Sequence, residues 1–148
     1  MKGVSLQPGS AAGELLVLEE PLSFWGGTDL ATGTVVDAHH PQLGLALTGR
    51  VVAMAASRGS SSSSSVLAEQ IRLGVGPAAL LLRSPDAIVS LGAMIAAELY
   101  DRETPVVLLE PGDFDRLPGH PGLALVDAGP RDALVALAHP HRAADLDR

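Results

Sequence analysis

The second half of the chain alternates apolar runs of strand length with segments of helical periodicity, and this alternation constrains the fold most strongly. The first such pair is "RVVAMAA" followed by "SVLAEQIRLG", whose apolar stripe ends at Gly74. A regular order of strand, helix and strand predicts a parallel sheet with crossover helices. The predicted strands are 50–56, 78–83, 105–110 and 123–128, and the predicted helices are 65–74, 84–101 and 129–139.

The ends of the second helix carry recognisable signals. Ser84 is the predicted N-cap and Pro85 takes the first helical position, where its missing N–H costs nothing. The third helix, "GPRDALVALAH", is short and rich in alanine and leucine. We therefore expect three helices to accompany the sheet.

The first fifty residues have a different pattern. Short β candidates at 13–20, 33–38 and 45–49 are separated by glycine and proline turns, without a helix-length pattern between them. The prediction is an α/β fold with a central parallel-rich sheet, helices on one side and an added β layer from the N-terminal part. We expect one domain over residues 1–148, with a polar tail at about 140–148.

Composition excludes several classes of protein. A net charge of −7 and a single lysine, Lys2, argue against nucleic acid and against anionic membrane surfaces. No run approaches the ~18 apolar residues of a membrane span, and the beginning of the chain has no apolar core typical of a signal peptide. We expect a cytoplasmic protein. Because there is no cysteine, neither a disulfide framework nor a thiolate-bound metal centre is expected on this chain.

Six consecutive serines, Ser60–Ser65, stand between the first predicted strand and the first predicted helix. A flexible tether would separate two units that each have their own core. Here the run joins two elements that need each other to complete one β–α–β unit. We therefore interpret it as a tight loop of a single domain.

A loop of this kind can bind an anion. A turn from a strand into a helix presents free backbone N–H groups and the positive end of the helix dipole. Arg58 stands beside the run and can clamp a carboxylate or a phosphate. The alternative for Ser64 and Ser65 is that they only cap the helix. A phosphate-loop motif is absent, which disfavours nucleotide hydrolysis.

A second unusual segment is "PLSFWGGTDLATGTVVDAHHPQLG", residues 21–44. It places Phe24 beside Trp25 in a chain with only 3% aromatic residues. A hydrophobic plug followed by a turn is one interpretation, and a functional surface is the other. The pair His39–His40 is a weak metal motif, because neighbouring side chains diverge and no carboxylate or cysteine partner is evident. We expect no metal here.

At this point the residues resemble a known family. "SFWGGTD", "HHP" and "RGS" with serines following resemble, in order and spacing, the small subunit or swivel domain of the aconitase X family. The resemblance covers about residues 3–110 and implies a swivelling β/β/α domain. It assigns the general base to Ser60. It also implies that four loop residues bind the substrate: Arg58, Gly59, Ser61 and Ser64. A further group is implied to contact either the partner subunit or the substrate: Trp25, Gly26, Gly27, Asp29 and His40.

The resemblance also implies an activity and a partner. It implies that the chain is the small subunit of a hydro-lyase and is active only with a large subunit. That large subunit would hold an iron–sulfur cluster on its own cysteines, and this chain would carry no cofactor. The implied substrate is a small hydroxy acid, cis-3-hydroxy-L-proline in first place. The alternatives are mevalonate 5-phosphate, or a non-catalytic module of the same fold that binds small anions.

The sequence departs from the family pattern at two positions. Family members usually carry glycine where this chain has Ser57 and Ser63. A glycine lost from a tight loop is expected to restrict the backbone angles there.

Overall fold

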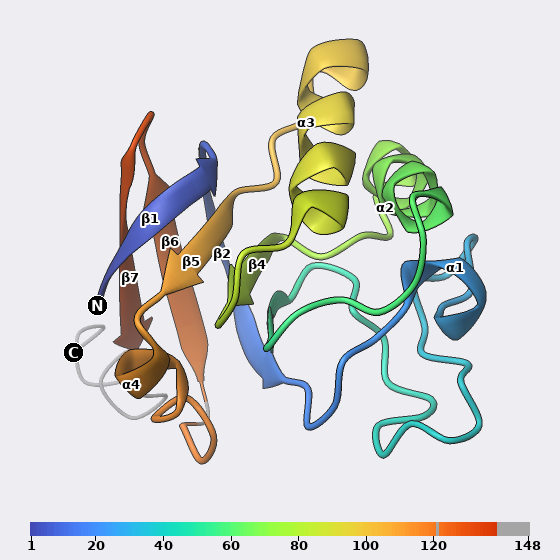
Figure 1. Cartoon of the computed structure of the whole chain (residues 1–148), viewed down its shortest axis with the longest axis horizontal. Coiled ribbons are helices and arrows are strands. Elements are labelled where there is room, and N and C mark those ends of the chain that lie inside the picture. The colour runs from blue at the N-terminus through green and yellow to red at the C-terminus, as the bar shows by residue number, and fades with distance from the viewer. Residues whose placement is uncertain (121, 139–148) are drawn as a thin grey trace, which may run out of the picture.

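The architecture is a closed barrel with two helices packed on one side (Figure 1). A computed structural model describes residues 1–120 and 122–138. The strands are β1 (Lys2–Gln7), β2 (Gly9–Val17), β3 (Val51–Met54), β4 (Ala79–Leu82), β5 (Val106–Leu109), β6 (Leu123–Ala128) and β7 (Asp132–Ala138). The helices are α1 (Phe24–Gly27), α2 (Ser62–Leu73), α3 (Ala87–Tyr100) and α4 (Pro111–Phe114).

Strand order around the barrel is β1-β5-β4-β3-β2-β6-β7. Strands β2, β3, β4 and β5 are parallel to one another. Helix α2 connects β3 to β4, helix α3 connects β4 to β5, and residues 18–50 connect β2 to β3, so each connection returns the chain to the same end of the sheet. The other pairings are antiparallel, and β1 closes the barrel by pairing with both β5 and β7. The predicted fold class is confirmed. The added β layer was expected from the N-terminal part, and β1 does come from there, but the C-terminal hairpin β6–β7 supplies the rest of it.

Two apolar clusters occupy the two faces of the parallel strands. Val51 and Ala53 of β3 point into the barrel, whereas Val52 and Met54 point toward α2 and α3. All four side chains are fully buried. Burial on both faces explains why β3 and β4 are continuous apolar runs and show no alternation. Helices α2 and α3 lie on one side of the barrel, as Figure 1 shows, and the helix-side cluster also includes Val106 of β5.

The structure confirms the predicted β–α–β elements within a few residues. The strands predicted at 50–56, 78–83 and 105–110 correspond to β3, β4 and β5, and the one at 123–128 is β6. The helix predicted at 65–74 begins earlier, at Ser62, and Gly74 caps its end at φ 78°. The serine run is therefore no tether, since its last four residues form the first turn of α2.

Residues 129–139 were predicted as a helix, and this prediction is wrong. Residues 132–138 form β7, which pairs with β6 from Leu123↔Ala138 to Ala128↔Ala133. Inward residues alternate with outward ones along β7, with Ala133 and Val135 buried and Leu134 exposed. Ala-Leu composition favours a helix locally, but tertiary pairing overrides this weak preference. Residue 139 and the predicted tail at 140–148 lie outside the described residues.

Two smaller predictions also need correction. The N-cap of α3 is Asp86, whose side chain accepts hydrogen bonds from Ile88 N and Val89 N, so Ser84 is not the cap and Pro85 precedes the helix. The β candidates at 33–38 and 45–49 contribute only isolated bridges, Thr28↔Val35 and Thr34↔Ala46. The candidate at 13–20 overlaps β2. Within the described residues, no helix has the length and apolarity to span a bilayer.

Candidate functional site

The candidate site is the loop from the end of β3 to the start of α2. Arg58 N donates to Leu22 O at 3.0 Å, which fixes the entry of the loop. Gly59 then adopts φ 110°, a conformation that other residues rarely adopt. Ser60 and Ser61 are exposed, and α2 begins at Ser62.

The backbone N–H groups of this loop are available to a ligand. Among the described residues, the N–H groups of Gly59, Ser60 and Ser61 have no hydrogen-bond acceptor, and Ser61 caps α2 without a side-chain bond. The same end of α2 carries the positive end of the helix dipole. These groups and the exposed Arg58 guanidinium make the loop suited to a carboxylate or phosphate.

The six serines divide into two kinds. Ser60, Ser61, Ser62 and Ser65 are exposed, whereas Ser63 and Ser64 are 0% and 2% exposed. Ser64 Oγ donates to Ile88 O at 2.7 Å and so joins α2 to the start of α3. This placement does not favour the predicted contact of Ser64 with substrate, and we leave it out of the proposed site. Ser65 is exposed and makes no capping bond.

The predicted segment 21–44 packs against the serine loop. Trp25 N donates to Ser63 Oγ at 3.3 Å, and Ser23 Oγ lies 3.3 Å from the same atom. A Cβ atom on Gly59 would lie 2.7 Å from Ser23 Oγ, so the two segments touch at that glycine. Residues from two distant parts of the sequence therefore form one surface, on which α1 and α2 are neighbours (Figure 1).

The base of this surface is tied to α2 by a buried glutamine. Gln70 is fully buried, and its Nε2 donates to Thr28 Oγ1 at 2.8 Å and to Asp29 O at 3.1 Å. Thr28 Oγ1 in turn donates to Phe24 O. Phe24 itself is fully buried in the helix-side core, which confirms that it plugs the fold, whereas Trp25 is 63% exposed.

Two predicted residues have clear local roles in this structure. Asp29 Oδ1 accepts from Ala31 N and Thr32 N, which makes a side-chain-stabilised turn. His40 is buried, with Nδ1 accepting from Gln42 N at 3.0 Å and Nε2 lying 3.1 Å from Glu20 O. These two contacts assign the proton to Nε2, which donates to that carbonyl. Both side chains are thus engaged with the protein's own backbone.

Gly26 and Gly27 form the second half of α1, directly before the turn at Asp29. Gly26 has φ 81° with open space around it, and Gly27 is buried with its carbonyl accepting from Val36 N. Gly26 lies within α1, and its positive φ lets the chain turn directly after the exposed Trp25.

The two departures from the family pattern do not strain the loop. Among the described residues, Asp101 is the one non-glycine residue at positive φ, so neither Ser57 nor Ser63 needs glycine's freedom. Both hydroxyls make hydrogen bonds: Ser63 with Trp25 N, and Ser57 with the carboxylate of Asp86. Serine is therefore accommodated at both positions without a positive φ. Ser23, Gln70 and Asp86 were not among the predicted site residues. Of these, Asp86 carries a signal in the sequence, because it lies directly before an apolar helical stripe.

The described residues bring together no group of three or more His, Cys, Asp or Glu side chains that could hold a metal ion. The whole chain also lacks cysteine. The donors of the described residues therefore do not fit an iron–sulfur cluster on this chain.

Two ion pairs that shift pKa values lie outside the loop. On α2, the hydrogen bond between Arg72 and Glu69 lowers the pKa of Glu69 and raises that of Arg72. A hydrogen bond from Arg83 to Asp115 raises the pKa of Arg83. Both pairs are exposed to solvent and so contribute little to stability.

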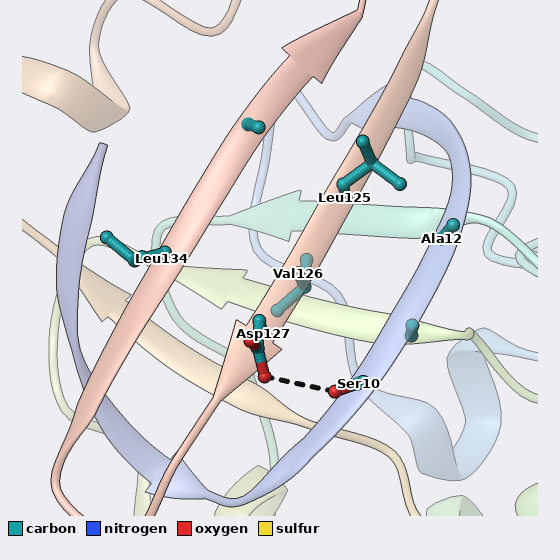
Figure 2. Close-up of a pocket in the computed structure, with 8 residues that line it drawn as sticks. Ser10, Ala12, Leu125, Val126, Asp127 and Leu134 are labelled. Atoms are coloured by element: carbon teal, nitrogen blue, oxygen red, sulfur yellow. Dashed lines mark hydrogen bonds between the residues drawn. The ribbon is translucent and has the colours of Figure 1, made fainter.

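A separate depression lies on β2, β6 and β7, away from α1 and α2 (Figures 1 and 2). Its volume is about 550 Å³ and its lining is mainly apolar, including Leu125 and Leu134. Figure 2 shows its labelled carboxylate, Asp127, accepting a hydrogen bond from Ser10 at 3.0 Å. Its lining residues include no cation, so the serine loop is the better candidate for chemistry on an anion.

Comparison with known proteins identifies relatives over most of the chain. The family model of the aconitase X swivel domain matches residues 1–128. A cis-3-hydroxy-L-proline dehydratase of Pseudomonas aeruginosa is 48% identical over 124 residues, which cover 83% of this chain and 21% of the relative. A phosphomevalonate dehydratase small subunit of Thermococcus onnurineus is 35% identical over 127 residues, which cover 86% of this chain and 98% of the relative.

A solved structure shares the fold. The crystal structure of Thermococcus kodakaraensis aconitase X in its holo-form has a TM-score of 0.77 and 29% identity, covering 92% of this chain and 98% of that chain. This chain spans about a fifth of the length of two curated relatives, the Pseudomonas dehydratase and a Hypocrea jecorina counterpart that is 41% identical.

Proposed function

The chain belongs to the aconitase X swivel domain family, and from this premise we propose that it is the small subunit of an aconitase X-type dehydratase whose general base is Ser60. The observation that carries the proposal is the geometry of the loop. The Ser60 hydroxyl is exposed beside free backbone N–H groups at the start of α2. Relatives named dehydratases match most of this chain.

The proposed reaction removes water from a hydroxy acid. Ser60, as its alkoxide, takes a proton from the carbon next to the carboxylate, and the C–H electron pair becomes the π bond of the product. The C–O bond breaks on the neighbouring carbon, and the hydroxyl leaves as water after it gains a proton. Ser60 then releases its own proton to complete the cycle.

The surroundings of Ser60 supply what a serine base needs. An alkoxide is stabilised by backbone N–H groups and by the helix dipole, provided that water is excluded. The N–H groups of Gly59 and Ser61 lie next to it in the chain, without acceptors among the described residues. Arg58 is exposed beside them and would bind the substrate carboxylate.

A partner is needed to exclude water, because this loop is open to solvent in the single chain. Apolar side chains stand exposed on the adjoining segment, with Trp25 63%, Leu43 52% and Leu45 38% exposed. Exposed apolar groups of this kind are typical of an interaction surface. We propose that the large subunit covers residues 57–65 and 23–44, and that any iron–sulfur cluster is held by that subunit.

Cis-3-hydroxy-L-proline is the proposed substrate. Two relatives named for that substrate are 48% and 41% identical to this chain, whereas two phosphomevalonate dehydratase small subunits are 38% and 35% identical. Mevalonate 5-phosphate is the second candidate, since the loop can bind a phosphate as well as a carboxylate.

The test is to co-express the chain with its large subunit and to assay both substrates anaerobically. Ser60→Ala is expected to lower kcat by a factor of about 100 or more, the scale of a lost proton-transfer group. Ser62→Ala is the matched control, because Ser62 is also exposed but begins the helix. Its activity should stay close to that of the wild type.

Two outcomes would contradict the proposal. If Ser60→Ala keeps more than half of the activity, the base lies elsewhere. If the complex dehydrates neither substrate yet the chain still binds carboxylates through this loop, the chain is a non-catalytic anion-binding module. Amide exchange in the same complex should slow at 57–65 and at 23–44, and protection of neither segment would place the interface elsewhere.

A further inference from the structure

The carboxylate of Asp86 links the serine loop to α3, because each of its two oxygens accepts two hydrogen bonds. Its Oδ2 accepts from Ser57 N at 2.5 Å and from Ser57 Oγ at 2.6 Å. Its Oδ1 accepts from Ile88 N at 3.0 Å and from Val89 N at 3.2 Å. One oxygen therefore holds the loop, and the other caps the helix.

The loop is held from its other side as well. Leu22 forms a bridge with Ser57, and Leu22 O accepts from Arg58 N. The backbone around Asp86 is itself anchored, because Arg83 N and Ser84 N both donate to Ala55 O. Ser57 is thus fixed between Leu22 and Asp86, three residues before Ser60.

The helix that carries Asp86 is a rigid support. Gly92 brings α3 so close to α2 that a Cβ atom there would lie 2.9 Å from Ser64 O. A carboxylate at the first turn of α3 is also favoured by the helix dipole. A group fixed in this way can hold a loop to within the small displacements that proton transfer tolerates.

We propose that Asp86 is a positioning residue, which acts through Ser57 to hold Ser60 in the geometry for proton removal. This inference rests on the proposed role of Ser60. It adds a residue outside the serine loop to the machinery of the reaction. Asp86 does not itself touch the substrate.

The test uses Asp86→Asn in the complex of this chain with its large subunit. Asparagine caps a helix as well as aspartate does, so Oδ1 keeps its bonds to α3. The amide nitrogen that replaces Oδ2 cannot accept from Ser57. We expect the chain to stay folded with a small loss of urea stability, because the charge at the start of α3 and the bonds from Ser57 are lost. We also expect faster amide exchange at Ser57 and Arg58, and a kcat lowered about tenfold or more at nearly constant KM.

Two controls separate positioning from a general effect. Asp132→Asn makes the same charge change on exposed β7 and should alter neither exchange nor kcat. In a double-mutant cycle, Ser57→Ala should lower kcat less than Asp86→Asn does, and the two together should lower it no further than Asp86→Asn alone, because both changes act on one contact. If Asp86→Asn unfolds the chain, Ser57→Ala decides by the same exchange and kcat measurements.

The outcomes distinguish this inference from the proposed function. Unchanged exchange at Ser57, or faster exchange with unchanged kcat, overturns the role of Asp86. An additive double variant overturns its action through Ser57. A wild-type complex without dehydratase activity overturns the proposed function and the catalytic role of Asp86 with it, while the exchange measurement still shows whether Asp86 holds the loop.

Discussion

At the scale of single residues, identical side chains in one run have different environments. Ser60 and Ser61 face solvent, whereas Ser63 and Ser64 are buried and hydrogen-bonded to neighbouring segments. The change comes where the loop becomes helix, because successive helical residues are turned by about 100° from one another. Gly59 directly precedes Ser60, and its positive φ sets the direction in which the chain enters the exposed part of the loop.

Gly59→Ala is expected to disturb the loop. The residue has φ 110°, and an added Cβ would lie 2.7 Å from Ser23 Oγ. We expect a loss of about 1–3 kcal/mol in the free energy of unfolding, the usual cost of a strained backbone position. Urea unfolding measures it. Gly112→Ala is the control, because it has open space and no positive φ; equal losses in both variants would contradict the strain.

At the scale of elements, β7 shows how pairing overrides local preference. Its sequence, "DALVALA", is compatible with a helix, yet it forms the second strand of a hairpin with β6. Pairing places Val135 in the barrel core and Leu134 outside, with exposed fractions of 2% and 58%. The period of two is visible in the burial pattern once the partner strand is known.

Of these two neighbours, truncation of the smaller side chain, Val135, should cost more stability than truncation of the larger one, Leu134. Val135→Ala is expected to lower the free energy of unfolding by about 1–3 kcal/mol, because it leaves a cavity in the core. Leu134→Ala removes more atoms but should cost less than about 1 kcal/mol, because they are largely in water. Equal costs in urea unfolding would mean that residues 132–138 do not form this strand.

At the scale of the whole molecule, the N-terminal strand completes the fold. Strand β1 pairs with β5 on one side and with β7 on the other, so the parallel and antiparallel halves meet there (Figure 1). Gly3 lies in β1, opposite Leu109 of β5 and Ala133 of β7. A Cβ atom on it would lie 2.6 Å from Val107 Cγ1 and 2.7 Å from Leu108 O.

Gly3→Ala therefore tests the closure of the barrel. The backbone oxygen cannot move aside without opening the β1–β5 pairing, so we expect a loss of about 1–3 kcal/mol in the free energy of unfolding, as for other overpacked sites. Lys2→Ala, at the exposed neighbouring position, should be nearly neutral. A stable Gly3→Ala variant with unchanged exchange in β1 and β5 would contradict this closure.

The sequence by itself determined the β–α–β half of the protein and the place of the serine loop within it. Apolar periodicity and caps such as Gly74 are local signals, because a strand or helix buries its apolar residues at its own period. The prediction that Ser60 is the general base came from the resemblance of "RGS" and its neighbours to a family motif.

Only the tertiary structure decided what those elements contact. The bonds of Trp25 to Ser63 and of Ser57 to Asp86 join residues 38 and 29 positions apart, and β1 meets β7 across almost the whole described chain. Such contacts leave no trace in local periodicity, because each partner satisfies only the preferences of its own segment. The strand at 132–138 was missed for the same reason: its hydrogen bonds belong to β6 and β1, and its conformation is chosen by those partners.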